Sequence, residues 1–393
     1  MNTELRLQFL NNSAFPALSI ADLTFFAPPQ RANPSILAMN TVLSKLKKKQ
    51  ASASNRVLII VPGYSVSTPP KIGDHRFYIN KLKFHQKTNP KGYRKIFLFD
   101  IYSKKDGRCN FQYDIPALAE ILYHTLTASN SDWEISEDKT IDFIGASMGG
   151  LIVRELLRRH LRGANLLENS KGRSLKIGTI VLIGTPNRGS KIVDYLQAPF
   201  LQFFLKIRYG KNHFAKSEQF RQIAVGNTNI FGPLLGKFFK KKTPNNDFLL
   251  TLNGSIQTPG TIRWITIRGT KRKWYAPFLF GNELNDGVIA ANSVPLCGAE
   301  NIADYNLPFN IAWDHRDLYE DEGFCNFLYG LLILQLSLVD YLEISNLIIT
   351  SSQSLPKRAF LIQKQRQPAN SLINLMLLSK KKQKDSFKCQ TLN

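Results

Sequence analysis

Short, mostly continuous apolar runs recur through the middle of the chain, and segments compatible with helices separate them. Four runs lie at residues 57–61, 95–99, 140–144 and 179–183, and helix-compatible segments lie at 115–126 and 150–161. Runs of this length without alternating polar residues are typical of strands buried on both faces. Because strands and helices alternate, the pattern predicts an α/β protein with a mostly parallel sheet flanked by helices.

The same pattern resumes after a long interruption. Further strands are expected at 262–267 and 302–311, and an apolar helix at about 327–342. About 70 residues rich in Phe, Leu and Lys separate the fourth and fifth strands, which is long for a simple connection. We therefore expect one domain over residues 55–350 that carries a lid or cap insertion at about 191–250.

The two ends of the chain differ from this domain. Residues 1–54 contain four prolines and no strong periodicity, so we expect an irregular arm and linker. Residues 351–393 are basic and weakly patterned, and we expect a tail. The apolar run at 327–339 is too short for a bilayer of about 30 Å, which favours a buried helix. A membrane span would have to include Asp340 and Glu343 and continue through residues 344–349.

The segment Gly145-Ala146-Ser147-Met148-Gly149 stands directly between an expected strand and an expected helix. A strand that turns sharply into a helix strains the turn residue, and small residues two positions before and after it avoid clashes. Such a turn presents the serine hydroxyl above the sheet, where the helix N-terminus favours negative charge. Ser147 is therefore the candidate nucleophile. A glycine-rich turn that only packs helix on sheet is the alternative.

Residues 144–150 resemble the nucleophile elbow of bacterial lipases and related esterases of the α/β-hydrolase superfamily. Two further segments are similar to lipase motifs, Val61-Pro62-Gly63-Tyr64 and Gly184-Thr185-Pro186-Asn187-Arg188-Gly189-Ser190, although Pro62 and Asn187 replace the family's usual histidines. The resemblance covers about residues 55–330. It implies an α/β-hydrolase fold and an oxyanion hole formed by the backbone amides of Tyr64 and Met148. A turn residue that packs on the core is the alternative for Tyr64.

The resemblance also implies that serine, acid and histidine follow one another in that order. Of the six histidines, only His315 follows the last expected strand. Asn285-Asp286-Gly287-Val288-Ile289 is similar to the lipase segment that carries the acid, so Asp286 is expected in that role. An ordinary turn at Asp286 and a surface histidine in an acidic loop are the alternatives, and the reserve acids are Asp304, Asp314 and Asp317.

Neither a metal nor a diffusible cofactor is expected. His315-Arg316-Asp317 resembles a His-x-Asp segment of calcium-binding lipases, but calcium needs roughly six to eight oxygen ligands and no second ligand is matched. The four cysteines are widely separated and form no C-x-x-C pair, which favours a reducing compartment. Because no signal peptide is apparent, we expect a cytoplasmic or peripherally membrane-associated protein.

The formal net charge of +23 is concentrated in clusters at 45–49, 237–242 and 380–388. The insertion over residues 191–247 holds ten basic and three acidic residues, together with the apolar stretch 200–205. A basic lid and tail would attract an anionic membrane, while apolar lid residues would admit acyl chains. A packed cap with solvated lysines is the alternative. Nucleic acid is not an expected partner, because no recognition motif accompanies the charge.

These observations lead us to expect a serine hydrolase that cleaves carboxylic esters of lipid-like substrates through an acyl-enzyme, as a lipase, phospholipase or esterase does. Thioesters, amides and the acyl chain of a lipid anchor are alternative substrates for the same residues. An alternative of another class is a catalytically inactive, basic protein of the hydrolase fold that binds a membrane or a partner. The sequence leaves the oligomeric state open.

Overall fold

The computed structural model describes the central part of the chain. The described residues are 7–9, 56–64, 93, 95–99, 101, 113–127, 140–168, 174–196, 218–225, 246–273, 275–304, 312–321, 324, 327–328 and 331–332. The expected arm at 1–54 therefore lies outside them except for one short strand, and the expected tail at 351–393 lies outside them entirely.

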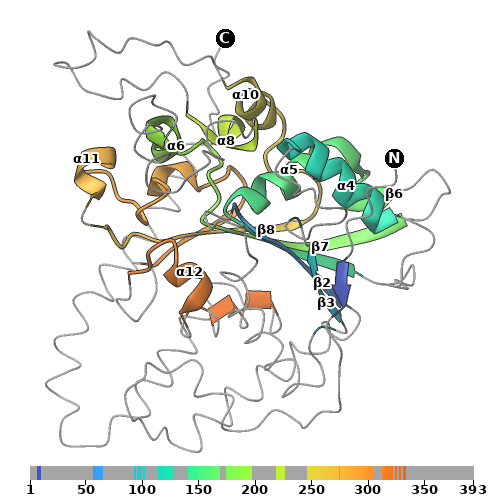
Figure 1. Ribbon diagram of the computed structural model, residues 1–393. Coiled ribbons are helices and arrows are strands. Elements are labelled where there is room, and N and C mark those ends of the chain that lie inside the picture. The colour runs from blue at the N-terminus through green and yellow to red at the C-terminus, as the bar shows by residue number, and fades with distance from the viewer. Residues whose placement is uncertain are drawn as a thin grey trace, which may run out of the picture.

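A nine-stranded sheet forms the centre of the molecule (Figure 1). Six strands run parallel in the order β3 (Lys95–Phe99), β2 (Arg56–Val61), β4 (Thr140–Ala146), β7 (Ser174–Ile183), β8 (Arg263–Arg268) and β9 (Glu300–Ala303). The buried parts of β2, β4 and β7 are almost wholly apolar, as parallel strands covered on both faces require.

Three short strands extend this parallel set in the antiparallel sense. β1 (Leu7–Phe9) pairs with the free side of β3 and lies within the expected N-terminal arm. β5 (Leu161–Arg162) and β6 (Leu166–Glu168) form a hairpin that pairs with the beginning of β7. None of the three is apparent in the sequence pattern, because two or three residues are too few to show a period.

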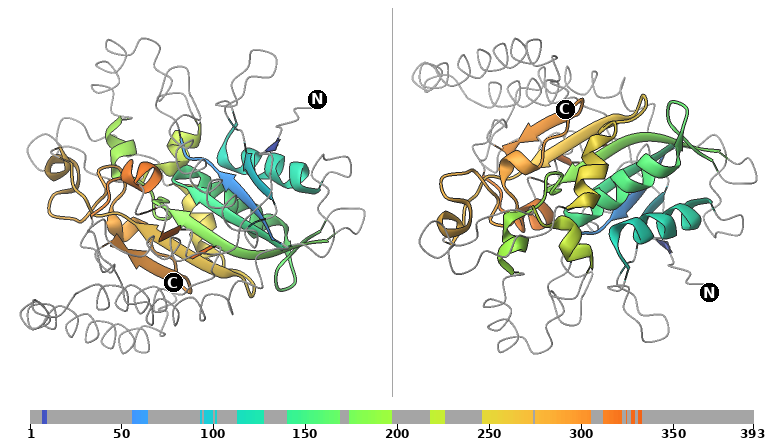
Figure 2. Two further views of the ribbon diagram at one scale, coloured as in Figure 1. Left: turned by 90° about the horizontal axis from the view of Figure 1, so that it is seen from below. Right: turned by 90° about the horizontal axis from the view of Figure 1, so that it is seen from above.

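Helices cover both faces of the sheet. α4 (Ile115–Thr127) and α5 (Met148–His160) pack side by side on one face, where α8 (Glu218–Ile223) and α10 (Asp247–Gly254) also lie (Figures 1 and 2). α12 (Asp317–Glu320) lies on the opposite face. Three short elements complete the described set, namely α6 (Lys191–Leu196), α11 (Ala276–Phe280) and the 3₁₀ turn η4 (Ala291–Ser293).

This architecture is the α/β-hydrolase fold that the sequence predicts, with a mostly parallel sheet and a sharp turn from β4 into α5. Two strands differ from their predictions by more than two residues. β7 begins at Ser174, five residues before the expected run 179–183, and β9 spans Glu300–Ala303 instead of 302–311, of which residues 305–311 lie outside the described part. Of the expected insertion, the described parts are α6, α8 and the start of α10, so its action as a lid stays a prediction.

The apolar segment expected near the C-terminus contributes to the core where it is described. Phe324, Phe327 and Leu331 are at most 1% exposed, and Trp313 packs against both phenylalanines. Within the ranges given above, the structure has no helix whose length and apolar character suit a membrane crossing.

Candidate active site

Ser147 occupies the turn between β4 and α5 in a strained backbone conformation. Its φ of 49° makes it the one residue other than glycine with a positive φ in the described part of the chain. Side chains with a Cβ adopt this region at a cost of about 1–3 kcal/mol, and proteins retain such strain mainly at functional positions. The Ser147 amide donates to the Ile183 carbonyl at 2.7 Å, which ties the turn to the end of β7.

The glycines around Ser147 allow backbone segments to approach one another too closely for any side chain. A Cβ on Gly145 would lie 2.5 Å from Gly150 Cα, and one on Gly149 would lie 2.1 Å from the Val61 carbonyl oxygen. Real Cβ atoms do not come so close to backbone. The sequence requirement for small residues at Gly145 and Gly149 therefore has a steric cause, the contact of α5 with β2 and β4.

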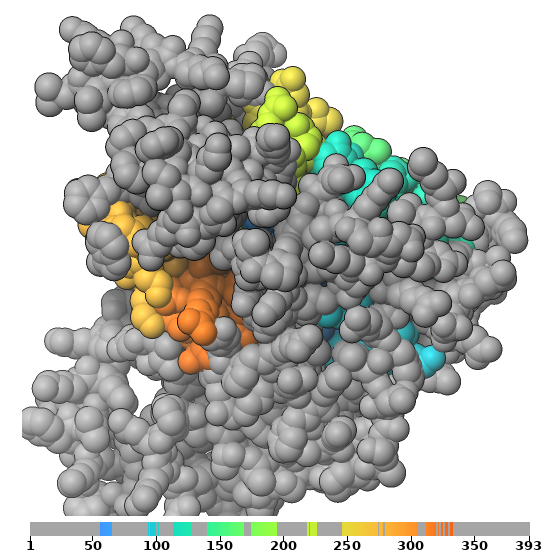
Figure 3. Space-filling model, in the orientation of Figure 1, coloured from blue at the N-terminus to red at the C-terminus, as the bar shows by residue number. Residues whose placement is uncertain are grey.

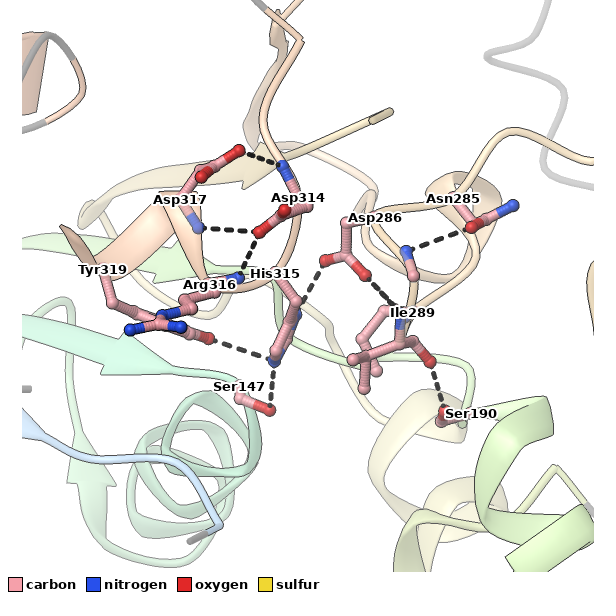
Figure 4. A network of polar contacts seen from close by, with 12 residues as sticks. Ser147, Ser190, Asn285, Asp286, Ile289, Asp314, His315, Arg316, Asp317 and Tyr319 are labelled. Atoms are coloured by element: carbon pink, nitrogen blue, oxygen red, sulfur yellow. Dashed lines mark hydrogen bonds and ion pairs between the residues drawn. The ribbon is translucent and has the colours of Figure 1, made fainter. Parts of the chain in front are cut away.

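A chain of hydrogen bonds joins the three residues that the sequence singles out (Figure 4). His315 Nδ1 lies 2.7 Å from Asp286 Oδ2, and His315 Nε2 lies 3.3 Å from Ser147 Oγ. Because a carboxylate only accepts, the Nδ1 proton is donated to Asp286 and Nε2 presents its lone pair to the serine hydroxyl. The arrangement can take a proton from Ser147 and stabilise the resulting imidazolium.

Asp286 is held as a buried carboxylate by the loop that contains it. Its side chain is 2% exposed, and Oδ1 accepts hydrogen bonds from the amides of Val288 and Ile289 at 2.9 and 2.7 Å. The Asp286 carbonyl in turn accepts from the His315 amide at 2.8 Å. Backbone and side-chain bonds therefore join the same two residues, which fixes the imidazole relative to the carboxylate.

The three reserve acids have other partners. Asp304, buried after β9, accepts from the Trp313 amide at 2.8 Å and so anchors the loop that precedes His315. Asp314 accepts from the amides of Arg316 and Asp317 at 2.8 and 2.9 Å and from Lys273 Nζ at 2.5 Å. Burial raises the pKa of Asp314, but the Lys273 hydrogen bond and the two amides lower it more, so that it lies below its ordinary value.

No metal-ligand cluster of three or more His, Cys, Asp or Glu side chains occurs among the residues that the structure describes. Asp317, which the sequence compares with a calcium ligand, accepts from Lys271 Nζ at 2.8 Å and from the Asp314 amide at 3.0 Å. In this structure a lysine ammonium therefore supplies the positive charge beside Asp317.

Of the two residues expected to form the oxyanion hole, Met148 directly follows Ser147, and Tyr64 lies in the loop after β2. Met148 begins α5, and amides in the first turn of a helix have no acceptor within the helix. Gly63 lies against the serine, since a Cβ on it would be 2.7 Å from Ser147 Cβ. Tyr64 follows Gly63, and its half-buried side chain packs on the core. The loop after β2 thus passes directly beside Ser147, but a role for either amide stays a prediction.

Asn187, which stands where the similar lipase motif carries a histidine, serves a structural purpose. Its side chain is fully buried; Nδ2 donates to the Val294 carbonyl, and Oδ1 accepts from Arg154 Nη1 at 3.2 Å. Arg154, on α5, also donates to the Leu252 carbonyl and to Asn253 Oδ1. Burial lowers the pKa of Arg154 to about 10, which leaves the guanidinium charged near neutral pH.

One residue of the site is absent from the sequence-based expectations. The Tyr319 hydroxyl lies 3.3 Å from His315 Nε2, the nitrogen that also faces Ser147 (Figure 4). The spacing of four residues from His315 to Tyr319 is the signal that could have revealed it, because such residues share a face where the chain is helical.

The orange segment that includes α12 reaches the molecular surface on the face shown in Figure 3, consistent with the 16% exposure of the His315 side chain.

No protein-family model matches this sequence, and no curated protein matches it either. Among solved structures, the chain is similar to the lipase BlEst2 of Bacillus licheniformis in its propeptide form, at 16% identity over 73% of this chain and 51% of that one, with a TM-score of 0.42. It is also similar to the phospholipase PlaB of Legionella pneumophila, at 13% identity over 76% and 64% of the two chains, TM-score 0.43.

A third similar structure is EstA from Clostridium botulinum, at 14% identity over 81% of this chain and 98% of that one, with a TM-score of 0.43. The chain spans about half the length of the BlEst2 propeptide form and less than two thirds of PlaB. At these identities and TM-scores, the likenesses assign no residue role or activity. The resemblance to α/β-hydrolases therefore rests on the sheet order and on the strained turn at Ser147.

Proposed function

We propose that this protein is a serine hydrolase that cleaves carboxylic esters of lipid-like substrates through an acyl-enzyme. The observation that carries the proposal is the hydrogen-bond chain from Ser147 through His315 to the buried Asp286. The strained backbone at Ser147 supports it independently, because a serine with positive φ has a cost that packing alone does not require.

In the proposed acylation step, the Ser147 proton moves to His315 Nε2 as Oγ forms a bond with the carbonyl carbon of the ester. Asp286 keeps its negative charge and stabilises the imidazolium through Nδ1. The tetrahedral intermediate carries its negative charge on the former carbonyl oxygen, which we propose is held by the amides of Tyr64 and Met148. The bond to the alcohol oxygen then breaks, and that oxygen takes the proton from Nε2.

In the proposed deacylation step, water attacks the acyl carbon while His315 Nε2 takes a proton from it. Collapse of the second tetrahedral intermediate releases the carboxylic acid and returns the proton to Ser147 Oγ. The reaction is balanced as ester plus water giving acid plus alcohol.

The lipid-like substrate class rests on the insertion and the charge of the chain. Ten basic residues accompany an apolar stretch in residues 191–247, a composition that suits contact with acyl chains and anionic headgroups. We propose peripheral contact with an anionic membrane through this insertion and the basic tail. A panel of p-nitrophenyl esters of increasing chain length, with phospholipids, tests the class. A preference for short, soluble esters would contradict it.

Labelling with a fluorophosphonate probe tests the proposed chemistry without knowledge of the substrate. The serine oxygen attacks phosphorus and fluoride leaves, so the probe reports an activated serine. We expect wild-type protein to be labelled and Ser147→Ala to remain unlabelled. Ser255→Ala is the matched control, because Ser255 Oγ donates to the Leu252 carbonyl at the end of α10, and this variant should be labelled as wild type is. Folded wild-type protein that fails to react in detergent would refute the proposal.

A further inference from the structure

Tyr319 brings a second hydroxyl to the nitrogen that exchanges protons in the proposed reaction. Its oxygen and Ser147 Oγ each lie 3.3 Å from His315 Nε2. Since the Nδ1 proton is donated to Asp286, Nε2 offers a lone pair, and Tyr319 donates its hydroxyl proton to it in the resting site. Two donors therefore share one acceptor.

The surroundings of Tyr319 hold its hydroxyl at this position. The residue is 6% exposed, and its ring meets the imidazole edge to face, with ring centroids 5.4 Å apart and planes at 87°. Its amide donates to the Arg316 carbonyl at 2.9 Å. A buried hydroxyl fixed by its ring and backbone makes a stronger hydrogen bond than a mobile, solvated one, because little ordering is needed when it forms.

Protonation of His315 removes the acceptor that Tyr319 uses. Once Nε2 carries the proton taken from Ser147, it has no lone pair left, so it no longer accepts a hydrogen bond from the Tyr319 hydroxyl. The oxygen that Nε2–H next faces is that of the departing alcohol, which must come within about 3 Å of Nε2 to receive the proton. An oxygen at that distance from Nε2 can also lie within hydrogen-bond reach of the Tyr319 hydroxyl, which is 3.3 Å from the same nitrogen.

We propose that Tyr319 donates a hydrogen bond to the leaving-group oxygen of the ester during acylation, as a catalytic residue in addition to Ser147, His315 and Asp286. The inference rests on the proposed function. The transferred proton comes from Nε2 and passes to the leaving oxygen, whereas Tyr319 keeps its own proton throughout. When the alcohol has left and Nε2 is again neutral, the tyrosine hydroxyl returns to it.

A comparison of two esters of one acid tests this role. Alkoxide is a poor leaving group that depends on proton donation and hydrogen bonding, whereas p-nitrophenolate leaves with little help. For Tyr319→Phe we expect kcat/KM on ethyl butyrate to fall by about tenfold or more, as for loss of a hydrogen bond to a charged oxygen. On p-nitrophenyl butyrate we expect a fall of less than about threefold. The parameter kcat/KM is chosen because it reports acylation.

The ratio of the two values separates a chemical role from a structural one. A loosened or partly unfolded site would lower both by the same factor, and an unchanged ratio would overturn the inference. Tyr123→Phe is the matched control, since Tyr123 on α4 stacks on His160 at the opposite end of α5 from Ser147 and donates its hydroxyl to the Glu168 carbonyl. Its ratio should equal that of wild type. Wild-type protein that hydrolyses neither ester and resists the fluorophosphonate would instead refute the proposed function, and this inference with it.

Discussion

The strain at Ser147 can be measured by comparing two variants that both lack the hydroxyl. Ser147→Ala keeps the Cβ at a φ of 49°, whereas Ser147→Gly removes it. Both lose the contact of Oγ with His315 Nε2, so the difference in their free energies of unfolding isolates the Cβ. Neither variant should react with a fluorophosphonate.

The expected difference follows from opposing terms. Relief of a positive φ is worth about 1–3 kcal/mol. Two contributions destabilise the glycine variant and oppose this gain. The greater freedom of glycine in the unfolded chain costs about 0.5–1 kcal/mol, and the loss of one partly buried carbon costs up to about 0.8 kcal/mol. The glycine variant should therefore be more stable than the alanine variant by about 1 kcal/mol.

Urea unfolding, followed by circular dichroism, measures this difference. With a denaturant slope of about 3 kcal/mol per molar, the midpoint of Ser147→Gly should lie about 0.3 M above that of Ser147→Ala. Without strain, only the two opposing contributions would remain, and the midpoint of Ser147→Gly would lie about 0.2–0.6 M below that of Ser147→Ala. Backbone conformation would then give no support to a functional role for Ser147.

Three further predictions concern the supports of the site. Asp286→Asn should keep the fold but slow fluorophosphonate labelling by about 10³–10⁴-fold, because an amide cannot stabilise the imidazolium; a loss below tenfold would argue against Asp286 as the acid. Gly149→Ala should lower the free energy of unfolding by about 1–3 kcal/mol, since its Cβ would lie 2.1 Å from the Val61 carbonyl oxygen, whereas Gly254→Ala, with open space around it, should not be destabilised. The pKa of Asp314 is lower in the folded protein than its value of about 3.9 in the unfolded chain, so the carboxylate adds stability above that pH, and this contribution is lost as the pH falls through the folded-state pKa. The melting temperature of Asp314→Asn should therefore depend less on pH below about 4 than that of wild type. An unchanged dependence would contradict this prediction.

Much of the fold could be predicted from local sequence because its strands are buried on both faces. The runs at 57–61, 95–99 and 140–144 are apolar enough to identify strands one by one, and the structure places β2, β3 and β4 there. The hairpin of β5 and β6 could not be predicted in this way. Its strands have two and three residues, and pairing with β7 rather than composition defines them.

The turn at Ser147 can be predicted from local sequence, because a strand, a small-residue turn and a helix are local features whose requirements appear within about ten residues. It also limited the histidine to His315, through chain order and the small number of histidines. The contact of His315 with Ser147 across 168 positions, and that of Tyr319 with the same nitrogen, arise from the three-dimensional packing of the chain. Such contacts depend on how the ends of β4 and β9 are placed by the whole sheet, and no local pattern encodes a distance between strands that are not neighbours in sequence.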